Sequence, residues 1–367
     1  MSGKNNLYHV EFEQGYYNET IADTFEQYLE EEGKNSMCPE CDVFVAMPDK
    51  KHNYFEKAED IDGELKDHWL KTMKCFKNFC KPTKMQASIV AKDKFVVEAG
   101  ETAMVSYGIA PYLSRWSPYH GALYTVVLAL AKLVACGGDY RNAKVSFEEY
   151  YKNAEGKGCE SCGKAFTDSE NEGKKMAALL GAYEAKKGFG LGDIEDQAVV
   201  ELADGFLQDC YGDIEAKPDF RTVGFNVTKE EYAVATAFKK PDNKIVRFCI
   251  PYDKYDRPIY EEAMITYKKF HKMVKNGYIQ SAYAVGIGGT MEALAKMSYD
   301  RNYGVRIDED IRLEQLSQKA YGAIVAEIKP RDIRHIEIPC MFLGEVIEEP
   351  VMMYHDEVIE LDELYEV

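Results

Sequence analysis

The feature that most constrains the fold is an alternation of strand and helix patterns from about residue 220 onward. Short apolar runs rich in β-branched and aromatic residues predict strands, and the longer amphipathic stretches between them predict helices. We expect strands at 221–227, 245–251, 280–285, 303–307 and 322–328, and helices near 259–276, 290–298 and 313–319. Alternation of this kind indicates an α/β or α+β layered fold.

The first half of the chain has a different composition and residue pattern. Residues 1–80 are acidic and tyrosine-rich, with helical spacing between Glu19 and Glu32. A long apolar helix is expected over residues 121–136, because the Gly137-Gly138 pair is typical of a helix C-terminus. The other elements expected before residue 220 are strands at 85–92, 94–99, 101–108 and 144–150, a polar glycine-rich loop or insertion at 156–173, and a helix at 176–188.

Length and charge limit the classes of function. A chain of 367 residues with 46% hydrophobic residues has enough material for two or three folded domains. Its net charge of −18 disfavours nucleic acid or an anionic membrane as the main partner, because both would repel it. The apolar stretch from Gly121 to Cys136 is shorter than the ~20 residues that a membrane-spanning helix requires. With no apolar signal segment at the N-terminus, we expect a cytoplasmic protein.

Four stretches, in order along the chain, carry recognisable motifs: MVSYGIAPYLSRWSPYHGALYTVVLALAKLVACGGDYRNAKVSFEEYY (104–151), MAALLGAYEA (176–185), SAYAVGIGGTMEALAKMSYDRNYGVRI (281–307), and YGAIVAEI (321–328) with the tail GEVIEEPVM (344–352). Together they resemble the C-terminal synthetase half of the large phosphoribosylformylglycinamidine synthases of purine biosynthesis. Several motifs in order are far more specific than any one of them. The resemblance implies an α+β, aminoimidazole ribonucleotide synthetase-like fold of two subdomains with an added N-terminal region. The implied division is an N-terminal region at 1–80, a first, sheet-pairing subdomain at 81–218, a second α/β subdomain at 219–334, and a tail at 335–367.

The resemblance also implies a function and partners. Members of this family convert an amide to an amidine on a ribonucleotide, using ATP and Mg²⁺, and two synthetase halves lie side by side. This chain resembles one half and shows no glutaminase-type nucleophile motif, so the expected partner is a second copy or a second synthetase half. The enzyme hypothesis is therefore a partner-dependent C–N ligase that binds ATP or ADP. The alternative is a non-catalytic descendant that acts as a nucleotide-binding or protein-interaction module.

Two departures from the family pattern favour the alternative slightly. Where the family has a GGKDS-type phosphate loop, residues 188–217 carry acidic side chains that include Asp193, Glu195 and Asp196. Those carboxylates would repel a phosphate unless Mg²⁺ intervened, or they could form a metal site of another kind. Leu128 stands where the family typically places a magnesium-binding glutamate, and an apolar side chain cannot bind a hard cation.

Two loops carry the candidate ligand-binding residues. Gly286, Gly288 and Gly289 follow a predicted strand and precede a helix that begins near Thr290. Free backbone N–H groups and the helix dipole at such a turn suit a phosphate, although a turn that only permits close packing has the same pattern. The loop SRWSPYHG (114–121) groups Arg115 and His120, which could contact a phosphate or a ring, or could simply be structural. The sequence assigns no catalytic residue.

Two CxxC pairs, absent from the family pattern, predict a structural zinc site. Cys38 and Cys41 form one pair, and Cys159 and Cys162 form the other. Each pair has the spacing with which two thiolates bind one tetrahedral Zn²⁺. The alternatives are unrelated thiols or a redox pair. The remaining cysteines are expected to be core thiols: Cys75, Cys80, Cys136, Cys210, Cys249 and Cys340.

Overall fold

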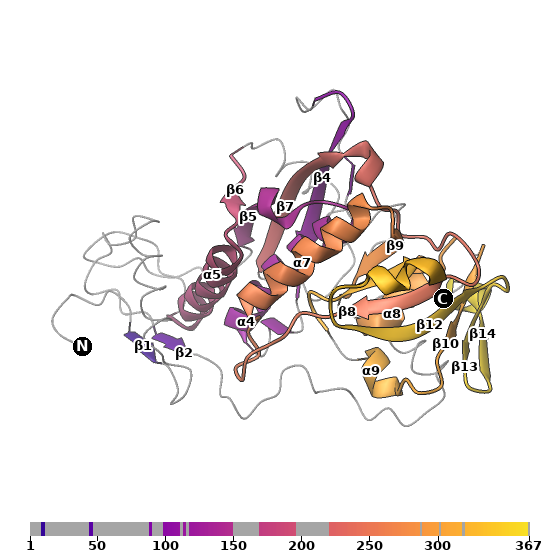
Figure 1. Cartoon of the computed structure of the whole chain (residues 1–367). Helices are drawn as coiled ribbons and strands as arrows, with labels where there is room; N and C mark the ends of the chain where they lie inside the picture. The colour runs from indigo at the N-terminus through magenta and orange to yellow at the C-terminus, as the bar shows by residue number, and fades with distance from the viewer. Residues whose placement is uncertain are drawn as a thin grey trace.

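The computed structural model describes residues 9–11, 44–46, 88–89, 98–110, 113–114, 117–149, 169–195, 220–286, 288–300, 302–317 and 320–365. Two large sheets and the helices that pack between and around them make up most of these residues (Figure 1). A short parallel pair, β1 (His9–Glu11) with β2 (Phe44–Ala46), lies outside both sheets.

The first sheet has five strands in the order β3-β4-β7-β5-β6. They are β3 (Ser88–Ile89), β4 (Glu101–Gly108), β7 (Phe220–Lys229), β5 (Lys144–Glu149) and β6 (Gly192–Asp193). The helices α4 (Pro118–Ala135) and α5 (Ser169–Phe189) bury their apolar residues with those of one face of this sheet. Polar contacts also join α4 to the sheet, because the hydroxyls of Thr125 and Thr222 lie 2.6 Å apart.

The second sheet has seven strands in the order β14-β13-β10-β12-β8-β11-β9. They are β14 (Glu357–Glu360), β13 (Val351–Tyr354), β10 (Gly304–Ile307), β12 (Cys340–Ile347), β8 (Lys244–Phe248), β11 (Ile324–Ile328) and β9 (Ile279–Ala284). Successive side chains of a strand point to opposite faces. In β8, Val246 and Phe248 therefore join the core around α4 and α7 (Tyr260–Lys275), whereas Ile245 joins a second core. That second core contains α8 (Gly289–Met297) and α9 (Leu313–Ser317).

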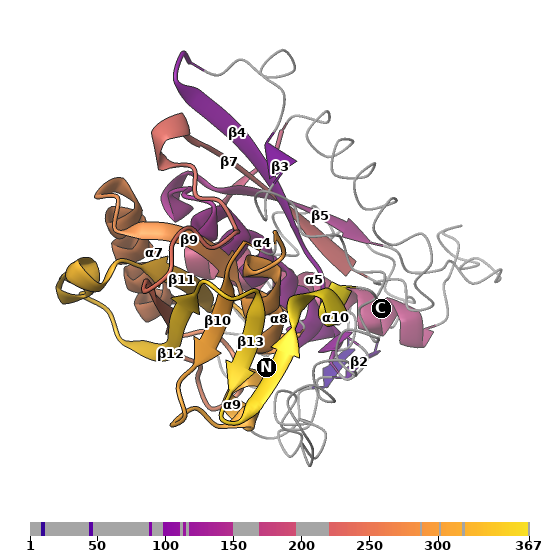
Figure 2. The ribbon, with the colours of Figure 1, turned by 90° about the vertical axis from the view of Figure 1, so that its right-hand side faces the viewer.

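Helix α4 is the centre of the molecule. Its residues share one core with β4, β5 and β7 of the first sheet and with β8, β9 and β11 of the second, and Figure 2 shows it between the two sheets. Ser117 caps its N-terminus by accepting a hydrogen bond from the backbone N–H of His120, and Pro118 occupies the first turn. Among the described residues it is the one helix long and apolar enough to cross a membrane, but 89% of its 18-residue window is buried inside the protein. Such burial is expected of a core helix.

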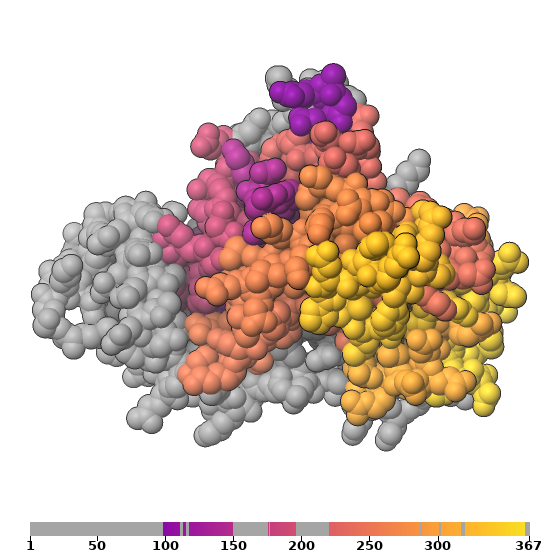
Figure 3. All heavy atoms as spheres, in the orientation of Figure 1, coloured from indigo at the N-terminus to yellow at the C-terminus, as the bar shows by residue number. Residues whose placement is uncertain are grey.

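Smaller elements complete the described chain: η2 (Tyr140–Asn142), η3 (Glu230–Tyr232), η4 (Pro330–His335) and α10 (Leu361–Tyr365). On the face seen in Figure 3, α7 lies beside the C-terminal part of the chain. Lys269 and Lys272 of α7 hold this contact, because both donate hydrogen bonds to Glu337.

The predicted α+β fold is confirmed, and every strand and helix expected between 221 and 328 is present with ends shifted by a few residues. Strand β7 pairs with β4 and β5, so the change from one sheet to the other falls between Lys229 and Lys244 rather than at the predicted boundary of 218 and 219. The tail predicted at 335–367 supplies β12, β13 and β14 to the second sheet. The division into independent domains stays a prediction, and the N-terminal region of 1–80 lies almost wholly outside the described residues.

Candidate functional site

The glycine turn between β9 and α8 packs closely against the helix that it opens. Gly289 has a φ of 68°, in the left-handed region, and its N–H donates to the carbonyl of Gly286 over 3.1 Å. The N–H of Gly288 donates to Oε2 of Glu292 over 2.8 Å. A Cβ atom added to Gly288 would lie 2.5 Å from Cβ of Glu292, so this position has no room for a side chain. The sequence thus places a carboxylate of α8 against the helix's own N-terminus.

Two lysines balance the charge of Glu292. Lys296, one turn further along α8, places Nζ 2.5 Å from Oε1 of Glu292. Burial raises the pKa of Glu292, but Lys296, the Gly288 N–H and Lys132 outweigh it, so the pKa lies below its usual range. Lys132 comes from α4 and donates to the carbonyl of Tyr107 over 2.8 Å. Burial, reinforced by the charge of Lys296, lowers the pKa of Lys132 to about 8.

A third cation reaches α8 from the second sheet. Arg247 lies on β8, is 3% exposed, and donates from Nη1 to Oγ1 of Thr290 and to the carbonyl of Gln315, both over 2.7 Å. Its Nε has no hydrogen-bond partner, and no carboxylate of the described residues forms an ion pair with it. Arg247 therefore reaches the first turn of α8 through Thr290, whereas Lys296 pairs with Glu292 and Lys132 acts on Glu292 through its charge. We call these four charged side chains and the glycine turn the α8 site.

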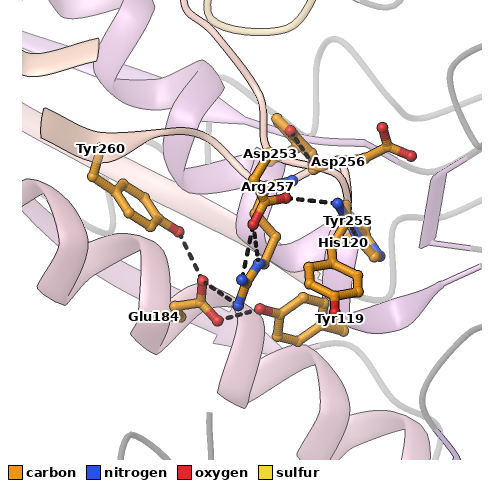
Figure 4. Close-up of polar contacts among 9 residues, drawn as sticks. Tyr119, His120, Glu184, Asp253, Tyr255, Asp256, Arg257 and Tyr260 are labelled. Carbon is orange, nitrogen blue, oxygen red and sulfur yellow. Dashed lines mark hydrogen bonds and ion pairs between the residues drawn. The ribbon is translucent and has the colours of Figure 1, made fainter. Parts of the chain in front are cut away.

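A second polar cluster joins α4, α5 and the loop that precedes α7 (Figure 4). Tyr119 and Tyr260 both donate hydrogen bonds to the carboxylate of Glu184. Arg257 lies 3.6 Å from Glu184 and 2.8 Å from Asp253, so it bridges two carboxylates. Burial raises the pKa of Glu184, and Arg257 acts against that shift. Because the groups in this cluster are partnered with one another, its evident role is to fasten the loop to the two helices.

His120 belongs to this second cluster and not to the α8 site. Its Nε2 lies 2.7 Å from the carbonyl of Tyr255, and its Nδ1 lies 2.7 Å from Oγ of Ser117. A carbonyl only accepts, so Nε2 carries the proton and Nδ1 accepts from the serine hydroxyl. Burial lowers the pKa of His120 to about 4, so the ring is neutral at pH 7. Lys132 is twelve residues further along α4 than His120, a distance of about 18 Å along the helix.

The structure therefore brings together Gly286, Gly288, Gly289 and Thr290, but it does not bring His120 to them. Arg115 and the four cysteines predicted to bind zinc, Cys38, Cys41, Cys159 and Cys162, lie outside the described residues. Within the described part of the chain, no three histidine, cysteine, aspartate or glutamate side chains gather as metal ligands. Leu128 is 2% exposed in the core of α4, so hydrocarbon fills the place where the resemblance implies a magnesium ligand. Asp193, in the acidic loop, forms an ion pair with Lys186 over 2.5 Å.

No protein-family model and no curated protein matches the chain, but solved structures do. PurL from Thermotoga maritima complexed with FGAR superimposes with a TM-score of 0.58 and 14% identity, covering 82% of this chain and 53% of that one. The same protein complexed with ADP gives 0.56 and 16%, covering 82% and 51%. PurLQS from T. maritima gives 0.54 and 16%, covering 81% and 48%.

The fold is shared with PurL. At these identities the likeness concerns the fold, and the chain spans about half the length of the structures it matches. The shared fold agrees with the resemblance implied by the sequence motifs.

Sequence reasoning foresaw the glycine turn but missed the charged side chains around it. Glu292 and Lys296 are four residues apart in EALAK, a spacing that brings side chains together on a helix. Lys132 is the single charged residue in the apolar segment 121–136, which is a signal in itself, because an isolated charge in a core helix needs a partner. Arg247 gives no comparable signal, since a charged residue in a short strand is more often exposed.

Proposed function

We propose that this protein binds ATP or ADP with the phosphates against the N-terminus of α8. The observation that carries the proposal is that Arg247 reaches the first turn of α8 through Thr290, while Lys296 and Lys132 act on Glu292, whose carboxylate lies on the glycine turn. Backbone N–H groups and the helix dipole attract phosphate, and neighbouring cations add charge-assisted hydrogen bonds. PurL structures with ADP, AMPPCP and ATP have the same fold, which supports a nucleotide as the ligand. Mg²⁺ would arrive bound to the nucleotide, because Leu128 offers no ligand.

The activity that fits the motif resemblance is ATP-dependent conversion of an amide to an amidine in purine biosynthesis, in the cytoplasm and with a partner. The second candidate is a non-catalytic nucleotide-binding or interaction module. Leu128 in the core and Glu292 at the α8 turn favour this second candidate, because one removes a metal ligand and the other opposes a phosphate. An enzyme and a nucleotide-binding module would both bind nucleotide, whereas a pure interaction module would not, so nucleotide binding is the property to test first.

Calorimetry with Mg·ATP and Mg·ADP tests this proposal. We expect weak binding by the wild type and no measurable binding by Gly288→Asp, which adds bulk and negative charge where no Cβ fits. Gly192→Asp is the matched control, because it adds the same group in the exposed β6, where a Cβ would make only an ordinary contact of 3.6 Å with Lys144. Binding that Gly288→Asp leaves unchanged would show that the nucleotide lies elsewhere.

The proposed partner is a second copy of this chain or a second synthetase half. The PurL and PurLQS chains are about twice as long as the region that they share with this protein, which leaves room in them for a second half. On the face of the first sheet away from α4, Phe225 and Val227 are half-buried beside a small apolar cluster of Ala103, Val105 and Val223, which is itself buried within the chain. Light scattering of the purified chain is expected to show a dimer. A monomer at high concentration, with no partner recovered, would contradict this.

The zinc site is proposed on the spacing of the two cysteine pairs alone. We expect one equivalent of zinc per chain in elemental analysis, with the four sulfurs ~2.3 Å from a common ion. Loss of zinc in the double variant Cys159→Ser and Cys162→Ser, but not in Cys249→Ser, would support it. Purified protein that contains no zinc and folds normally would contradict the proposed zinc site.

A further inference from the structure

We infer that the Glu292 carboxylate competes with a bound phosphate at the α8 site. The cations for which the two compete are Lys132 and Lys296. The inference rests on the proposed nucleotide binding and adds how that binding is limited. Glu292 places one oxygen 2.8 Å from the Gly288 N–H and the other 2.5 Å from Nζ of Lys296. A backbone N–H at a helix N-terminus and a lysine ammonium are the donors that a phosphate takes in such a position. The carboxylate therefore occupies the place of the ligand.

The charges around the turn indicate that this place is built for an external anion. Glu292 forms an ion pair with Lys296, which leaves the charges of Lys132 and Arg247 without a carboxylate in contact among the described residues. Arg247 is 3% exposed, reaches Thr290 in the first turn of α8, and keeps an unpaired Nε there. A buried guanidinium that lacks a counter-charge is costly unless an anion is present. The surplus is local, since the whole chain carries a net charge of −18.

The two lysines and Gly286 are the more exposed residues of the site. Gly286, Lys132 and Lys296 are each partly exposed, whereas Gly288, Thr290 and Glu292 are buried. A phosphate that reaches the turn would have to displace the carboxylate of Glu292 from Lys296 and from the Gly288 N–H. Rotation of the Glu292 side chain would move the carboxylate away. For this reason we expect the wild type to bind weakly.

The simpler explanation is that Glu292 only caps the helix, as a glutamate in a capping box does. Glu292→Gln separates the two explanations. The amide oxygen of glutamine still accepts from the Gly288 N–H, so the cap is kept, but the negative charge is gone. If Glu292 competes with the ligand, the Glu292→Gln variant binds the phosphate about tenfold to a hundredfold more tightly than the wild type. This factor corresponds to one charge-assisted hydrogen bond that the phosphate gains. If it is only a cap, affinity does not change.

Calorimetry with Mg·ADP on four variants tests the inference. We expect tighter binding by Glu292→Gln, loss of binding by Lys132→Met, and near-normal binding by Lys132→Arg, which keeps the charge. Glu345→Gln is the control, because that carboxylate pairs with Lys244 and Arg306 in the second sheet and is not part of the α8 site. Thermal unfolding of each variant checks that it is folded.

The outcomes distinguish the two proposals. If the wild type binds Mg·ADP and Glu292→Gln binds it with equal or lower affinity, the competitor role is overturned and the proposed function stands. Absence of Mg·ADP binding in the wild type and in Glu292→Gln overturns both. If Glu292→Gln does not fold, Lys132→Met decides. Unchanged affinity of Lys132→Met for Mg·ADP would show that Lys132 does not bind the phosphate, and this would overturn the competitor role.

Discussion

Replacing Arg257 with methionine tests the second polar cluster, which fixes the start of α4. In the wild type the guanidinium lies 3.6 Å from Glu184 and donates from Nε to Asp253 over 2.9 Å. The side chains of Arg257 and Glu184 are each 13% exposed, so water screens the pair only partly. Methionine keeps most of the volume and removes the charge, which leaves Glu184 buried between two tyrosine hydroxyls without its cation. Breaking a buried pair in this way costs about 3–5 kcal/mol.

The loss of stability caused by Arg257→Met should become smaller as the pH falls. Burial raises the folded-state pKa of Glu184, and the loss of Arg257, which lowers it, raises that pKa further. A carboxyl whose folded pKa is raised contributes stability below its unfolded pKa of about 4.3 and loses it as pH rises through the folded value. The variant is therefore least stable relative to wild type at neutral pH, and the difference shrinks on acidification toward pH 5. Each unit by which the pKa rises corresponds to about 1.4 kcal/mol at neutral pH.

Urea unfolding of both proteins at pH 7.5 and pH 5.5 measures this difference. The double variant Arg257→Met with Glu184→Gln is the control, because glutamine has no charge to leave unpaired, and we expect it to be more stable at pH 7.5 than the single variant. A loss smaller than about 1 kcal/mol for Arg257→Met, or one that grows on acidification, would refute the reasoning.

Two further predictions concern packing and buried hydrogen bonds. Glu327 is fully buried and accepts from the backbone N–H groups of Lys239 and Lys240, from Asn243 and from Ser281, so Glu327→Ala should cost about 4 kcal/mol or more in urea unfolding. A cost below about 1 kcal/mol would mean that water replaces the carboxylate. At the crossing of α4 and α5, a Cβ on Gly181 would lie 2.0 Å from the carbonyl of Tyr119. Gly181→Ala should therefore lower the melting temperature by an amount equivalent to about 1–3 kcal/mol, whereas Gly192→Ala, which makes only ordinary contact, should not.

The elements of the second half could be predicted because their signals are local. Strands such as IVAEI (324–328) are short, apolar and bounded by polar residues or glycine, and α7 has a clear amphipathic period. The start of α5 is harder to predict, because SENEGKK (169–175) is polar throughout and its first residues fall in the stretch expected to be a loop or insertion. The helix is held by its second half, where Ala178 and Ala182 are fully buried, and the polar turn extends from that anchored part.

The boundary between the sheets could not be predicted from local pattern. Strand β7 has the same alternating character as the strands after it, yet it pairs with β4, more than 100 residues earlier in the sequence. Which strands pair is decided by tertiary contacts: Asn226 donates to the carbonyl of Asp139, and a Cβ at position 224 would lie 2.7 Å from Oγ of Ser106 and 3.1 Å from Leu133 of α4. Those contacts depend on the tertiary fold and leave no mark in the sequence near residue 220.

The charged side chains inside apolar elements show why one part of the site was foreseen and the rest was not. Lys132 and Glu327 are each the one charged residue of an apolar helix or strand, and Arg247 follows two apolar residues of β8. A charge in such a place requires a partner that the sequence does not name. In the structure, Glu327 finds donors for both oxygens within its own sheet and the loop beside it, so its requirement is met and its role is structural. Arg247 and Lys132 instead converge on α8, where Arg247 keeps an unsatisfied donor. A buried charge whose partners are incomplete is the stronger indication of a ligand, and this difference separates Arg247 from Glu327.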